Sequence, residues 1–298
     1  MDVTKFAPQE IVLSKTPFVV SLKYEGFQVP DDFYTKGYCV LDGVKNEKEA
    51  QIILEKLISS IDTKKLPIYT PFKSKIRLGK RDEIPVCGDS VETSFQALHF
   101  DMGQPLVSDE PQNMYLLTGL HITSDKKPTT AKTRVISLKG LFAGDEFGTE
   151  QEIEQKILKY VNEHGDGWIH PDKVNTHRIS CFARIVDAVA GTSELADYFD
   201  KSMAQWFADP KDKYNSEISI NNEKEFYVKR GVNLEPLAEN IVIQPGQLLV
   251  VDNMRTAHGR VGKREEKETW QFMYGVHDAT PQDIDWFRNC LVEILKSA

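Results

Sequence analysis

The stretch QPGQLLVVDNMRTAHGR, residues 244–260, joins a turn, an apolar run and a polar end. Pro245-Gly246 is a frequent turn pair, because proline presets φ and glycine tolerates positive φ. The apolar run that follows is typical of a buried strand. Its polar end leads to His258-Gly259-Arg260. We therefore expect a turn and a strand here, with His258 just beyond them.

Residues 240–253 as a whole are strand-like and are broken by the Pro245-Gly246 turn. Further strand-like runs lie on both sides, at residues 17–24, 37–43, 94–100, 113–123, 132–138 and 268–278. Helical patterns occupy residues 46–62, 149–165, 192–209 and 281–297. In the first helix, one apolar face recurs at steps of three and four: Ala50, Ile53, Leu54, Leu57, Ile58 and Ile61. Many short strands separated by turns indicate a mainly β fold with helical additions, either a β-barrel or a jelly roll.

We expect one domain over residues 1–298, with a lid loop at about 64–92 and a helical insertion at about 145–235. Within the insertion, residues 210–235 read as a polar loop with a short strand or two. The chain has neither GxGxxG nor GxxxxGK[ST], which argues against nucleotide chemistry.

The chain has 298 residues, 40% of them hydrophobic, and a formal net charge of −8. This acidity gives no global attraction to nucleic acid or to an anionic membrane. The four cysteines form no CxxC pair, and the N-terminal residues lack the pattern of a signal peptide. These features predict a soluble, cytoplasmic protein with neither nucleic acid nor a membrane as partner. They do not predict its oligomeric state.

Two further polar residues lie in ALHFDMGQP, residues 97–105, where a strand-like run ends. His99 and Asp101 are two positions apart, so their side chains share one face of a strand. Alone, this spacing is often a chance pattern. With His258 as a third ligand, it matches the two-histidine, one-carboxylate triad of non-haem Fe(II) oxygenases, which leaves positions open for substrate and O2.

The 245–260 segment resembles the Fe(II)/2-oxoglutarate oxygenase superfamily, in the branch of taurine dioxygenase and clavaminate synthase. Residues that match that branch in order are Pro245, Gly246, Asp252, Asn253, His258, Gly259 and Arg260. The resemblance implies a double-stranded β-helix, a jelly-roll barrel, with Fe(II) held by His99, Asp101 and His258. It also implies 2-oxoglutarate as co-substrate and oxidation by O2. Because Asp101 fills the position that is empty in halogenases, it implies hydroxylation, desaturation or oxidative cyclisation, in natural product biosynthesis.

The resemblance is incomplete at the co-substrate site. Thr133 matches a threonine that contacts the 2-oxoglutarate carboxylate in the branch, although the neighbouring glycines are absent. The arginine that the branch carries on the strand after the distal histidine is missing from residues 268–278. Three explanations are open: a basic residue from the preceding turn, one from another strand, or a different or absent co-substrate. The basic candidates are Arg134, Arg260, Arg264 and Lys267.

The start of the predicted lid, residues 64–81, holds seven Lys or Arg and no acid. It is either a solvated loop or an element that attracts an anionic substrate, carboxylate-bearing and amino-acid-like. The candidate substrate contacts are Tyr69, Lys75, Arg77 and Arg81. Two rival functions remain: a metal-binding barrel that senses or binds without turnover, and an isomerase-type enzyme on the same barrel. His121, within an apolar run, is expected to be a core or pocket residue.

Overall fold

The computed structural model describes residues 27–78, 95–99, 112–127, 129–138, 237–262 and 269–283, with isolated positions between 148 and 235 and residue 286. The predicted strand at 17–24 and the predicted helix at 192–209 lie outside these residues. Of the predicted helices at 149–165 and 281–297, only a few positions are described, and apart from Thr149 these are helical.

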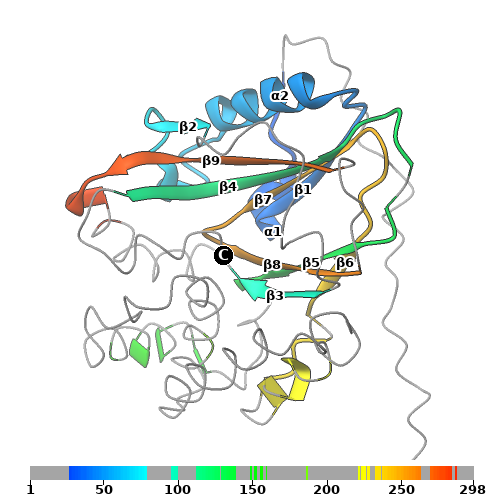
Figure 1. Ribbon diagram of the computed structural model, residues 1–298. Coiled ribbons are helices and arrows are strands. Elements are labelled where there is room, and N and C mark those ends of the chain that lie inside the picture. The colour runs from blue at the N-terminus through cyan, green and yellow to red at the C-terminus, as the bar shows by residue number, and fades with distance from the viewer. Residues whose placement is uncertain are drawn as a thin grey trace, which may run out of the picture.

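Two antiparallel sheets form the framework (Figure 1). In the five-stranded sheet the order is β1 (Tyr38–Asp42), β7 (Gln247–Asp252), β4 (Gln112–Ile122), β9 (Thr269–Ala279) and β2 (Ile76–Leu78). In the four-stranded sheet the order is β3 (Phe95–His99), β8 (Thr256–Val261), β5 (Lys132–Ser137) and β6 (Glu239–Ile241). From β2 to β5, and again from β6 to β9, consecutive strands alternate between the two sheets. The expectation of a mainly β fold is confirmed.

An apolar cluster joins the two sheets. It draws Val135 and Ile241 from the four-stranded sheet, and Tyr38, Leu120, Ile122, Leu249 and Val251 from the five-stranded sheet. Burial of these side chains supplies the main driving force for packing one sheet on the other. The inner face of each sheet is therefore the face that carries these residues.

The outer face of the five-stranded sheet is covered by α2 (Glu47–Ser60) (Figure 1). Asn46 caps this helix, since its side-chain oxygen accepts a hydrogen bond from the backbone N–H of Glu49 at 3.0 Å. All six residues of the predicted apolar face are buried. Leu54 packs directly over Gly119, where a Cβ would lie 2.6 Å from the Leu54 Cδ1 atom. Helix and sheet approach closely because residue 119 has no side chain.

Short elements escaped the sequence patterns. They are α1 (Asp31–Lys36), the one-turn 3-10 helix η2 (Pro67–Tyr69) and β2, the last two within the predicted lid loop. The strand β8 was missed as well: the sequence places His258 beyond a strand, whereas it lies within β8. The expected polar loop at 210–235 is also wrong in part, because residues 221, 223–225, 227 and 228 are helical. Three to eight residues hold too few turns for a periodic apolar face to stand out.

A network of buried charges and carbonyls joins α1 to the turn between β7 and β8. Arg255 donates from Nε to the Asp252 carboxylate at 2.6 Å, and from its two terminal nitrogens to the carbonyls of Phe33 and Tyr34 at 2.5 and 2.7 Å. The Thr256 hydroxyl donates to the Lys36 carbonyl at 2.9 Å. Asp252 and Arg255 therefore hold the end of α1 against the first residue of β8, the strand that carries His258.

Cys39 is buried and forms no disulfide; it is the only cysteine among the residues that the structure describes. Burial raises the pKa of its thiol. Within the same part of the chain, no helix has the length and apolarity needed to cross a bilayer.

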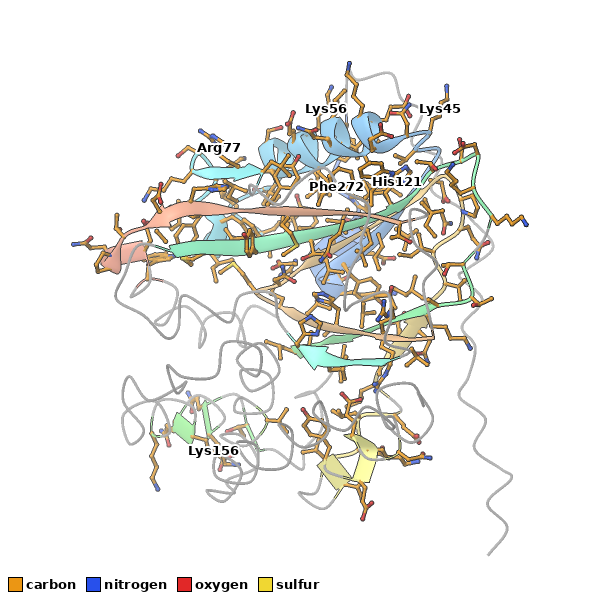
Figure 2. The ribbon with its side chains drawn as sticks, in the orientation of Figure 1. Lys45, Lys56, Arg77, His121, Lys156 and Phe272 are labelled. Atoms are coloured by element: carbon orange, nitrogen blue, oxygen red, sulfur yellow. The ribbon has the colours of Figure 1, made fainter. Side chains whose placement is uncertain are left out.

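His121 is a core residue, as expected from its apolar surroundings (Figure 2). Its Nδ1 lies 2.8 Å from the Gln247 carbonyl oxygen, so the neutral ring donates its N–H there. Burial lowers the pKa of His121 below its ordinary value. Just below pH 6.5, His121 is therefore protonated in the unfolded chain but still neutral in the folded chain.

The free energy of unfolding is thus expected to fall as the pH drops below about 6.5, by at most ~1.4 kcal/mol per pH unit from this residue. Urea unfolding of the wild type and of His121→Gln at pH 7.5, 6.0 and 5.0 isolates this contribution from that of the carboxylates. The difference between the two proteins should shrink as the pH falls. A constant difference would contradict the prediction.

Candidate metal centre

His99 and His258 face each other across β3 and β8. They are Cα partners in the antiparallel register of these strands. Their ring centroids are 4.6 Å apart with an angle of 47° between the ring planes, and both residues are buried. Two imidazoles at this separation can hold one metal ion between them.

The histidine pair lies on the inner face of the four-stranded sheet. On β5, the register partner of His258 is Val135, a member of the cluster between the sheets. Directly opposed residues of an antiparallel pair project to the same face. His99, His258 and Val135 therefore all project toward the interior between the sheets, where surrounding apolar groups limit access of water.

The third predicted ligand, Asp101, lies outside the described residues. Within those residues, no three His, Cys, Asp or Glu side chains gather as a metal site. The donors that are described fit iron: imidazole nitrogen suits Fe, Zn, Cu and Ni, and two of them leave room for a carboxylate and for open positions.

Arg260 and Thr133 form the next register pair beside the histidines. Arg260 follows His258 by two residues on β8, and Thr133 is its Cα partner on β5. Both are buried, at 2% and 1% exposure. Loss of water around the guanidinium lowers the pKa of Arg260 to about 10, which still leaves it charged at neutral pH. The period of two places Arg260 on the same face as His258.

Arg134 projects to the opposite face. Its Cα partner on β8 is Gly259, and its guanidinium forms a buried ion pair with Glu223. The other carboxylate oxygen of Glu223 accepts the backbone N–H of Leu98 at 2.9 Å. The structure thus separates Arg134 from the histidine pair, and Arg264 lies outside the described part of the chain.

The predicted lid contacts do not form one surface. Tyr69 is fully buried in the core, and burial, reinforced by the Asp252 charge, raises the pKa of its hydroxyl. This leaves Tyr69 no surface for a substrate. The Lys75 ammonium lies 2.5 Å from the Asp283 carboxylate. Arg77 is exposed on β2 (Figure 2), and Arg81 lies outside the described residues.

Glu223 is the residue that sequence reasoning missed. It lies in the segment read as a polar loop, yet it is 3% exposed and makes two polar contacts with the sheet. The available signal was helical spacing: Glu223 and Tyr227, four residues apart, are both buried on one side of the short helix.

Among known proteins, the chain resembles only solved structures, and no sequence match was found. No family model matches the chain, and no curated protein matches it. Asparagine oxygenase (AsnO) is 12% identical over 83% of this chain and 76% of its own, with a TM-score of 0.37. The non-heme iron oxygenase OrfP in complex with Fe is 12% identical over 83% of this chain and 78% of its own, with a TM-score of 0.36. At such scores the likeness decides neither fold nor function.

Another structure of asparagine oxygenase holds Fe(II), 2S,3S-3-hydroxyasparagine and succinate. It is 12% identical over 83% of this chain and 77% of its own, with a TM-score of 0.37. These ligands belong to that protein.

Proposed function

We propose that this protein is a non-haem Fe(II)- and 2-oxoglutarate-dependent oxygenase of a small molecule, with iron held by His99, Asp101 and His258. The observation that carries the proposal is the register pairing of His99 with His258, whose rings lie 4.6 Å apart on an inner sheet face. Asp101, two residues after His99, would supply the carboxylate.

The strand order supports the fold that this function uses. Alternation of consecutive strands between two sheets is the arrangement of a double-stranded β-helix, in which two antiparallel sheets enclose a site between them. We extend the proposal to a single jelly-roll domain over residues 1–298, with the segment at about 145–235 as an insertion.

Iron with 2-oxoglutarate and O2 would supply the oxidation of an unactivated carbon. The protein's own part is to bind and orient. Arg260 would hold the distal carboxylate of 2-oxoglutarate, because a buried guanidinium is a strong bidentate partner for a carboxylate. Thr133, opposite Arg260, would donate a hydroxyl hydrogen bond to the same ligand. The inner-face position of both residues beside His258 favours them over Arg134.

The substrate proposed is a small carboxylate-bearing molecule, with amino acids as the first class to test. Of the predicted lid contacts, the exposed Arg77 would attract such an anion, and Arg81, outside the described residues, stays a candidate. The reaction would be hydroxylation, or desaturation or ring closure, according to how the substrate is held.

The test of the function begins anaerobically. Fe(II) and 2-oxoglutarate are added to the protein, and the visible absorption band of the iron-bound co-substrate is recorded. O2 is then admitted, and succinate is measured with a panel of amino acids. Absence of the band contradicts 2-oxoglutarate binding at iron. A band without succinate for any substrate favours a binding or sensing protein.

Replacing Arg260 by alanine is expected to weaken 2-oxoglutarate binding about 10- to 100-fold, the loss for a charged hydrogen-bonding partner. Titration of the visible band with 2-oxoglutarate gives the dissociation constant. The control variants are Arg264→Ala and Lys267→Ala. A larger loss in any of these than in Arg260→Ala would assign the carboxylate to that residue instead.

A further inference from the structure

Glu223 forms a charged bridge behind the candidate metal centre. Its carboxylate is buried on the outer face of the four-stranded sheet. One oxygen accepts the N–H of Leu98 on β3, and the other accepts the guanidinium of Arg134 on β5. Because β8 lies between β3 and β5, the bridge crosses β8, at the position of Gly259 opposite Arg134. A residue without a side chain leaves that crossing open.

The Leu98 contact lies within an irregularity of β3. Gln96 pairs with Arg260 and His99 pairs with His258, so β3 has two residues where β8 has only Gly259. This is a β-bulge, and its extra residue disrupts the hydrogen-bond ladder locally. The Glu223 carboxylate supplies an acceptor for the N–H of Leu98 within it.

The bulge determines which side chain meets His258. If the register continued regularly from Gln96, Leu98 would be opposite His258, and His99 would project to the outer face. A shift of one residue reverses the face of every side chain that follows. The extra residue therefore brings His99 to the inner face.

We infer that Glu223 is a positioning residue for the metal centre: it holds the β3 bulge that presents His99 to His258. This inference rests on the proposed function, since it assigns a role toward the same site. A buried ion pair seldom adds net stability over well-packed apolar groups. Stability alone therefore does not explain the Arg134–Glu223 pair. Its hydrogen bond with the Leu98 N–H indicates a role in holding the β3 bulge.

The test uses Co(II), a spectroscopic substitute for Fe(II), added to the metal-free full-length protein. The main variant is Glu223→Leu/Arg134→Met, which replaces the buried pair by apolar groups but removes the acceptor for Leu98. Glu223→Gln is the milder variant, because its amide offers only one acceptor oxygen to the Leu98 N–H and the Arg134 guanidinium. Asp283→Asn is the matched control. Asp283 is also buried, accepts the backbone N–H of Thr280 at 3.0 Å and pairs with Lys75.

Two readouts are recorded. The first is the Co(II) dissociation constant from visible absorption. The second is the contact between the rings of His99 and His258, observed by NMR in histidine-labelled, metal-free protein. Thermal unfolding of each variant checks that it is folded at the assay temperature.

The Glu223 variants should bind Co(II) at least ~10-fold more weakly, as loss of groups that orient metal ligands does elsewhere. They should also lose the ring contact, whereas Asp283→Asn keeps both signals even if it unfolds at lower temperature. Unchanged affinity and an unchanged ring contact in folded Glu223 variants would overturn the inference. If the wild type binds no Co(II), the proposed function fails, and the ring contact alone then decides the role of Glu223.

Discussion

Replacing His258 by alanine should weaken metal binding by more than ~100-fold, because loss of groups that merely orient ligands already costs 10- to 100-fold. His258 is buried, shares its register position with His99 and has its ring 4.6 Å from that of His99. Without it, the inner face keeps one imidazole of the pair, and one imidazole with the carboxylate proposed for Asp101 would hold a divalent ion poorly. Succinate formation should fall with metal binding.

Titration with Co(II) under argon measures the effect directly, without turnover. His99→Ala should behave in the same way. His121→Gln is the matched control, because it also removes a fully buried imidazole, one bonded instead to the Gln247 carbonyl. Equal Co(II) affinity in the wild type and in His258→Ala would place the metal elsewhere and remove the basis of the proposed function.

Replacing Arg255 by alanine should lower the free energy of unfolding by about 3–5 kcal/mol, the usual cost of leaving one charge of a buried pair without its partner. The Asp252 carboxylate, 0% exposed, would lose its guanidinium. The carbonyls of Phe33 and Tyr34 would lose the hydrogen bonds that Arg255 donates to them. The link between α1 and the start of β8 would then be broken.

Urea unfolding of the wild type and the variant gives this difference. Arg77→Ala, which removes an exposed arginine, should change the free energy by no more than about 0.5 kcal/mol. Arg255→Lys retains the charge but not the planar guanidinium. Its loss of unfolding free energy should therefore lie between those of Arg255→Ala and Arg77→Ala. An unchanged unfolding midpoint for Arg255→Ala would show that the network contributes no stability.

The Arg255 network also explains part of the motif on which the family resemblance rests. Asp252 and Asn253 match that branch, and here both are structural. Asp252 pairs with Arg255, and the Asn253 side chain donates to the Thr118 hydroxyl at 2.8 Å. The matching residues therefore have two kinds of role. His258 is a candidate metal ligand, whereas Asp252 stabilises the turn before the strand that carries His258.

Much of the framework was predictable because its signals are local. The apolar face of α2 repeats at steps of three and four, and the longer strands are rich in apolar and β-branched residues. The elements missed were α1, η2, β2, β8 and the helical residues around Glu223, all too short for such a period. Their positions depend on contacts with distant segments, as Glu223 depends on Leu98 and Arg134.

By itself, the sequence determined the alternation of strands and turns and the amphipathic face of α2. These follow from periodicities of two and 3.6 residues, which adjacent residues define. Only the tertiary structure decided that a bulge turns His99 inward, that Arg134 pairs with Glu223 on the outer face, and that Tyr69 is buried. Strand register and ion pairing are contacts between residues far apart in the chain, and no local pattern specifies them.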